Sequence, residues 1–203
     1  MYKNGHITPI IYLAIIMLVM PVSLSAQKLS REAEKVKFAY DELMKTPLAP
    51  VMQIRYLQAF PDNADDFINV FNPHTHDQLQ EVAVDYVKRF RELGYDFEDS
   101  VLPKSIAIGK QLTTWSPGAV DELQKTIYFV TDKHRQKFLD IVKEMKNEEI
   151  QSMARFLYSG KKGENKNYYV LIEIIERAGE KRIAKQFYKV AKEESEKVLE
   201  EHE

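Results

Sequence analysis

Apolar positions recur with the spacing of an α-helix along most of this chain. The strongest stripe places apolar side chains three and four positions apart, at Leu79, Val82, Ala83, Tyr86, Val87 and Phe90. Gly94 follows this stripe and is expected to end the helix, because glycine adopts the left-handed backbone conformation at little steric cost. We find no run of alternating apolar and polar residues between turns, as a half-buried β-strand would show. The pattern therefore predicts an all-α protein.

Comparable stripes predict further helices in both halves of the chain. Ser30 and Asn147 are expected N-caps, whereas Gly160 and Gly179 are expected helix ends. Between residues 95 and 115, a proline and a glycine interrupt the pattern, which predicts a short or kinked helix. The remaining stripes are made by Val36, Ala39, Tyr40, Leu43 and Met44; by Val120, Leu123 and Ile127; by Phe138, Ile141, Val142 and Met145; by Tyr168, Leu171, Ile172 and Ile175; and by Ile183, Phe187, Val190 and Ala191.

The connections between these stripes are short, so successive helices are expected to pack antiparallel. The prediction is an array of about eight or nine helices. Two architectures satisfy it, a globular bundle and a set of stacked helical hairpins, and the spacing does not choose between them.

The first residues have the three-part layout of a secretory signal. Lys3 precedes an apolar run over residues 10–20, and Pro21 and a small-residue segment follow it. A membrane-spanning helix needs about 20 apolar residues, which is longer than this run. Cleavage is expected near Ser25 or Ala26, so that residues 1–26 form a signal peptide and residues 27–203 a single α-helical domain with an acidic helical tail. The mature protein is then periplasmic or secreted, without a stable membrane anchor.

Composition excludes several classes of chemistry. The chain has no cysteine, which removes disulfides, lipid attachment through a thiol and thiol catalysis. Its 29 basic and 31 acidic residues give a formal net charge of -2, which provides no positive field for nucleic acid. Near the C-terminus, basic residues alternate with acids along a predicted helix and indicate a solvated face; they are Lys181, Arg182, Lys185, Lys189 and Lys192.

His74 and His76 form the sharpest local motif, two imidazoles one residue apart before the strongest helix. They could bind a divalent metal, but two ligands are fewer than the three or four of a zinc site. The further ligands would come from Asp62, Asp65 or Asp66. The alternative is an exposed loop in which a neighbouring threonine or aspartate caps the helix.

No other motif predicts catalysis or a cofactor. The chain contains no Glu-x-x-His pair, no His-Glu-x-x-His, no glycine-rich phosphate loop and no Gly-x-Ser-x-Gly elbow. A hydrolytic triad is recognised by geometry rather than by order, so it stays open. We therefore assign no catalytic residue and no cofactor, and the balance is against an enzyme.

Aromatic residues gather in the second half of the chain, several of them in adjacent pairs. Two neighbours on a helix cannot both face one core, so one ring of each pair is expected to approach solvent. Tyrosines commonly anchor protein interfaces, although ordinary packing between helices would use the same residues. The candidate partner-binding residues are Tyr128, Tyr158, Tyr169 and Tyr188.

Residues 59–160 resemble a family of uncharacterised secreted α-helical bacterial proteins. The positions that carry the resemblance are Phe60, Pro61, Phe67, Phe71, Trp115, Leu123, Gln124, Asn147, Glu148, Glu149, Ile150, Phe156, Leu157 and Gly160. Ser159 departs from the acid expected before the final glycine. The resemblance implies export and a helical fold, and it brings no activity, cofactor or site residue.

Three functions remain open. The first is an exported, non-enzymatic protein that binds an unknown protein partner in the envelope or outside the cell, an inhibitor or immunity protein being one version. The second is a metal-dependent hydrolase that uses His74 and His76. The third is a carrier of a small molecule or lipid in a cavity between helices.

Overall fold

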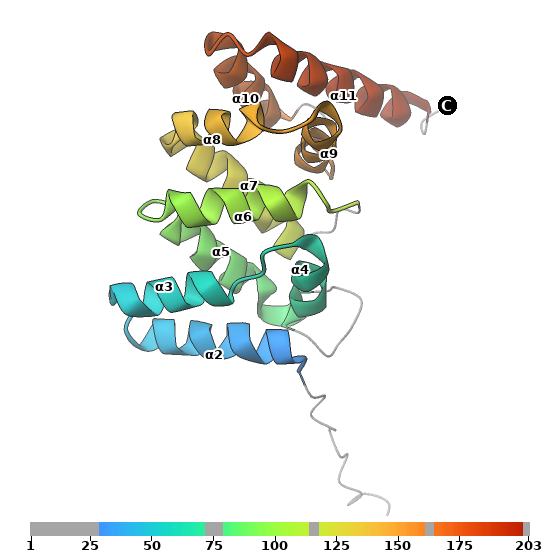
Figure 1. Cartoon of the computed structure of the whole chain (residues 1–203). Helices are drawn as coiled ribbons and strands as arrows, with labels where there is room; N and C mark the ends of the chain where they lie inside the picture. The colour runs from blue at the N-terminus through green and yellow to red at the C-terminus, as the bar shows by residue number, and fades with distance from the viewer. Residues whose placement is uncertain (1–28, 72–78, 114–117, 161–164, 201–203) are drawn as a thin grey trace, which may run out of the picture.

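The computed structural model describes residues 29–71, 79–113, 118–160 and 165–200 (Figure 1). These ranges contain ten α-helices, one short 3-10 helix and no strand, which confirms the all-α class. The elements are α2 (Arg31–Lys45), α3 (Pro50–Ala59), α4 (Ala64–Phe71), η1 (Gln80–Val82), α5 (Ala83–Leu93), α6 (Glu98–Gly109), α7 (Ala119–Lys133), α8 (Arg135–Lys143), α9 (Asn147–Tyr158), α10 (Lys166–Arg177) and α11 (Lys181–Glu200).

The helices form a stack that follows chain order. Figure 1 shows α2 at one end and α10 with α11 at the other, the intervening helices lying in layers between them. The main packing partners are close in sequence: α2 with α3, α5 and α6 with α7, and α9 and α10 with α11. The arrangement is closer to the stacked-hairpin alternative than to a bundle around one axis.

Most of the predicted inward positions are buried. Ser30 caps α2 as expected, since its Oγ accepts a hydrogen bond of 3.0 Å from the backbone N–H of Ala33. Met44 and Val82 are exceptions, because both are about half exposed. Val82 belongs to η1, whose three residues per turn rotate it away from the face that α5 buries. Met44 lies in the last turn of α2, the helix at one end of the stack.

Gly94 corrects one prediction. Its φ of -64° is right-handed, so it does not end α5 through the left-handed conformation. A Cβ built on Gly94 would lie 2.4 Å from Cγ2 of Val130 and 3.1 Å from Cγ1 of Val101. Glycine is needed here because α7 and α6 approach the end of α5 closely. The ends expected at Gly160 and Gly179 do have positive φ, 75° and 77°.

Asn147 corrects a second prediction, since it is the first residue of α9 rather than its cap. The side chain of Glu149 accepts a hydrogen bond of 3.0 Å from the backbone N–H of Lys146. Asn147 instead accepts one of 2.9 Å from Arg182 in α11. The same guanidinium donates to the carbonyl groups of Lys143 and Met145, which ties the start of α11 to the α8–α9 junction.

The region predicted to hold a short or kinked helix forms α6, with Pro103 inside it. Gly109 ends α6 beside α9, where a Cβ would lie 2.7 Å from the ring of Phe156. In the first half of the stack, the rings of Phe60 and Phe90 stack with centroids 3.7 Å apart. Within the described residues, no helix is both long and apolar enough to span a membrane.

Candidate functional site

A groove of about 590 Å³ lies between α7 and α10, beside the end of α5. Each of the two longer walls is a helical stripe that spans two turns. The lining residues are Arg91 and Glu92 from α5; Lys125, Tyr128, Phe129 and Asp132 from α7; and Asn167, Val170, Leu171 and Ile174 from α10.

The middle of the groove is apolar. Phe129 and Val170 line it from the two helices, and they remain 38% and 47% exposed. Behind them, Leu171 and Ile174 are buried. Large apolar side chains scattered singly on a surface are common, whereas two that line one groove from different helices mark a candidate contact site.

Tyr128 forms a fixed part of the α7 wall. Its hydroxyl donates a hydrogen bond of 2.7 Å to the carbonyl oxygen of Leu157 in α9. Asn165, the N-cap of α10, also donates to that carbonyl at 3.0 Å. Burial raises the pKa of the Tyr128 phenol, so the group stays neutral at physiological pH. The hydroxyl is thus bound within the protein and holds the Tyr128 side chain in place in the wall.

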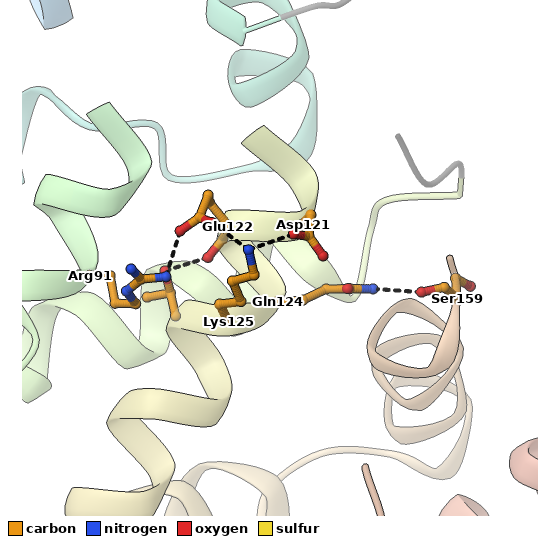
Figure 2. A network of polar contacts seen from close by, with 7 residues as sticks. Arg91, Asp121, Glu122, Gln124, Lys125 and Ser159 are labelled. Atoms are coloured by element: carbon orange, nitrogen blue, oxygen red, sulfur yellow. Dashed lines mark hydrogen bonds and ion pairs between the residues drawn. The ribbon is translucent and has the colours of Figure 1, made fainter. Parts of the chain in front are cut away.

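Figure 2 shows a network of charges between α5 and α7, and two of its members, Arg91 and Lys125, line the groove. Glu122 accepts from Arg91 at 2.5 Å and from Lys125 at 2.6 Å. Lys125 also contacts Asp121 at 2.7 Å, and these hydrogen bonds to the two carboxylates raise the pKa of its ammonium. Glu122 keeps only 10% of its side chain exposed. Both cations of the groove rim are therefore held by a nearly buried carboxylate.

The acids of the rim are held more loosely. Asp132 pairs with Arg135 at 3.3 Å, and their side chains are 59% and 56% exposed. Glu92 pairs with Arg89 at 3.0 Å and is 47% exposed. Exposed pairs of this kind contribute about 0.2–1 kcal/mol, so their carboxylates can exchange partners at little cost.

Gln124 joins the groove wall to the layer above it. Its side chain is fully buried, and its amide nitrogen donates to the carbonyl groups of Phe156 and Ser159 at the end of α9 (Figure 2). Unpaired carbonyls at a helix C-terminus need such donors. Gln124 therefore fixes α7 against α9, and with it one wall of the groove.

The four tyrosines predicted to bind a partner do not form one surface. Tyr128 alone of the four lines the groove. The hydroxyl of Tyr158 lies 2.9 Å from Oγ of Ser195, and its ring packs edge-on against Tyr168. Tyr169 and Tyr188 are partly exposed, and Tyr188 lines a separate depression at the α10–α11 turn. In each pair, Tyr168–Tyr169 and Phe187–Tyr188, the first ring is buried and the second approaches solvent, as expected.

The predicted metal site cannot be assembled from the described residues. His74 and His76 lie outside them, so their role as ligands stays a prediction. Asp62 pairs with Lys104, and Asp66 exchanges hydrogen bonds with Asn63 at the start of α4. Among the described residues, no three histidine, aspartate or glutamate side chains gather as a metal site would require.

The sequence pattern did not lead us to Val170 and Ile174, which line the groove from α10. A signal was present, because Asn167, Val170 and Ile174 follow the helical spacing on a second face of α10. That face was overlooked because the adjacent face, with Leu171 and Ile175, carries the stronger stripe.

No family model, no curated protein and no solved structure matches this chain. The resemblance to a secreted helical family stays a prediction.

Proposed function

We propose that this chain is a non-enzymatic binding protein that accepts a segment of a partner protein in the groove between α7 and α10. The observation that carries the proposal is the pair of partly exposed apolar side chains, Phe129 and Val170, on the two walls. Burying them under a partner would remove apolar surface from water, which is the main favourable term in protein association.

The groove is also suited to binding by its rigidity. Tyr128 is anchored to α9 by its hydroxyl, and Gln124 fixes α7 to the end of the same helix. Arg91, Glu122 and Lys125 brace the α5–α7 contact. A wall that is already ordered has less conformational entropy to lose on binding, and this raises affinity for a given contact area.

The proposed setting is the periplasm or the cell exterior. It rests on the signal-like layout of residues 1–26. Fractionation of the native host, with N-terminal sequencing of the protein recovered from the envelope, tests this setting. A start near residue 26 or 27 is expected, whereas a chain that retains Met1 in the cytoplasm would contradict it.

Site-specific photo-crosslinking tests the binding function. We expect benzoylphenylalanine at position 129 to give one saturable adduct in an envelope extract. Excess wild-type protein should compete for that adduct, and the Val170→Asp variant should not. Phe38 on α2 is the matched control, because it is an exposed phenylalanine away from the groove. Equal adducts from both positions, or equal competition by both proteins, would contradict the proposal.

A small apolar molecule is the second candidate occupant, and the volume of the groove favours it. About 590 Å³ lies within the range of about 300–1,000 Å³ found for small-molecule sites. The neutral dye N-phenyl-1-naphthylamine is a suitable probe. Stoichiometric binding that Phe129→Ser abolishes would support a carrier, and non-saturable binding unaffected by this change would exclude it.

A further inference from the structure

We infer that the occupant of the groove is an amphipathic α-helix of about two turns with a basic residue beside its apolar face. The inference rests on the proposed function and specifies the chemistry of the partner. Three properties of the groove lead to it: the kind of backbone in its walls, the length of those walls, and the unequal hold on its positive and negative charges.

The walls favour a helix over an extended segment. Both α7 and α10 satisfy their backbone hydrogen bonds internally, so neither offers a free edge that could pair with a strand. An extended segment lying against Phe129 and Val170 would therefore leave its own N–H and C=O groups without partners on that side. A helix meets this need within itself and presents only side chains to the groove.

The length of the walls sets the length of the helix. The α7 wall runs from Lys125 to Asp132, and the α10 wall runs from Asn167 to Ile174. At about 1.5 Å of rise per residue, each stripe covers about 10.5 Å, or two helical turns. An occupant with apolar residues at positions i, i+3 or i+4, and i+7 places its anchors along this distance.

The charges of the rim favour a basic occupant. Of its two cations, Arg91 is held by the nearly buried Glu122, whereas Lys125 is 46% exposed and already contacts two carboxylates, those of Asp121 and Glu122. Its two acids, Glu92 and Asp132, are about half exposed, and each pairs with one arginine three residues away, Arg89 on the same helix and Arg135 at the start of α8. A lysine or arginine of the partner can replace the single contact of either acid, whereas an acid of the partner would have to compete with the carboxylates that already hold Arg91 and Lys125.

Three labelled 12-residue peptides test the inference by fluorescence polarisation against the full mature chain. One has leucines at helical spacing with lysines elsewhere, the second replaces each lysine by glutamate, and the third alternates leucine with lysine. We expect the helical lysine peptide to bind saturably at one-to-one stoichiometry. The other two should bind at least tenfold more weakly.

Variants locate the binding and separate its components. Phe129→Ser and Val170→Ser should each weaken the helical lysine peptide tenfold or more, whereas the matched control Phe38→Ser should leave it unchanged. Circular dichroism and thermal unfolding confirm that each variant is folded. The double change Glu92→Gln and Asp132→Asn should reduce the preference for lysine over glutamate peptides to within about threefold while keeping the dependence on Phe129.

The outcomes distinguish this inference from the proposed function. A crosslinked partner at position 129, together with equal affinity for all three peptides or with no peptide binding, would overturn the basic helix and leave the binding function standing. Peptide binding that is insensitive to both groove variants would overturn the inference as well. Failure of both the crosslink and the peptide experiments would remove the groove as a binding site.

Discussion

Replacing Gly94 by alanine tests the close packing that sets the position of α5 against α7. The added Cβ would lie 2.4 Å from Cγ2 of Val130, 3.1 Å from Cγ1 of Val101 and 3.0 Å from the carbonyl oxygen of Arg91. Two of these atoms belong to buried valines that are fully enclosed by the core. The backbone at the site cannot be relieved by a single flexible side chain, so α5 or α7 must move.

Two effects of this change oppose each other. At a right-handed position such as Gly94, alanine restricts the unfolded chain and would by itself stabilise the protein by about 0.4–1 kcal/mol. Overpacking a well-filled core costs about 1–3 kcal/mol. The contact of 2.4 Å with a buried methyl group makes overpacking the larger effect, and we expect a net loss of about 1–2 kcal/mol.

Urea unfolding, followed by circular dichroism, measures this loss. In thermal unfolding of a chain of this length, a loss of 1 kcal/mol corresponds to a fall in melting temperature of about 2–4 °C. The variant that carries both Gly94→Ala and Val130→Ala supplies the control, because the shortened side chain makes room for the new methyl group. The double variant should be more stable than the sum of the two single losses predicts, by about 1 kcal/mol or more. A stabilised Gly94→Ala protein, or additive effects, would refute the packing argument.

Three further predictions concern the walls of the groove. Tyr128→Phe should lower the free energy of unfolding by about 1 kcal/mol, because it removes the donor to a carbonyl of α9. Burial raises the pKa of Tyr128 above that of the unfolded chain, so the stability that the phenol contributes is complete below about pH 10 and is lost as the pH rises above it. In urea unfolding between pH 9 and 11, the wild type should therefore lose stability more steeply than Tyr128→Phe. Gln124→Leu leaves two carbonyls at the end of α9 without their donor and should cost about 1–3 kcal/mol, with faster amide hydrogen exchange there; unchanged exchange would contradict this role. Glu122→Gln should lower the free energy of unfolding by about 1.5–3 kcal/mol, whereas Asp132→Asn, in an exposed pair, should lower it by no more than about 1 kcal/mol. Equal losses in thermal unfolding would show that burial does not strengthen the Arg91–Glu122 pair.

The helices could be predicted from the sequence where local rules decide the structure. Ser30 caps α2 because its side chain reaches an N–H three residues away, and Gly179 takes the left-handed conformation at the end of α10. At Gly94 tertiary packing decides the structure instead, because the nearest atom to a built Cβ belongs to Val130 of α7, which is distant in sequence. Asn147 does not cap α9, because Glu149 accepts the hydrogen bond from the backbone N–H before the helix and Arg182 donates to the side-chain oxygen of Asn147.

The candidate groove could be predicted less well, for a physical reason. Whether Val170 is buried depends on how far α10 lies from α7, and a single helix's pattern does not contain that distance. The contacts of charged residues cannot be predicted from the pattern of one helix either. Nothing in the spacing shows that Glu122 faces Arg91 of another helix, while Asp132 stays on the surface with Arg135.

The stack that follows chain order has a consequence for how the protein forms. Because α2 meets α3, α5 meets α7 and α9 meets α11, most contacts join segments that are close in sequence. Contacts of short sequence separation close small loops, and chains dominated by them fold quickly. Each layer can therefore assemble on the preceding one as the chain emerges from α2 onward. The groove is completed only when α10 arrives, so a chain interrupted before residue 166 would have a folded N-terminal part and no second wall for its partner.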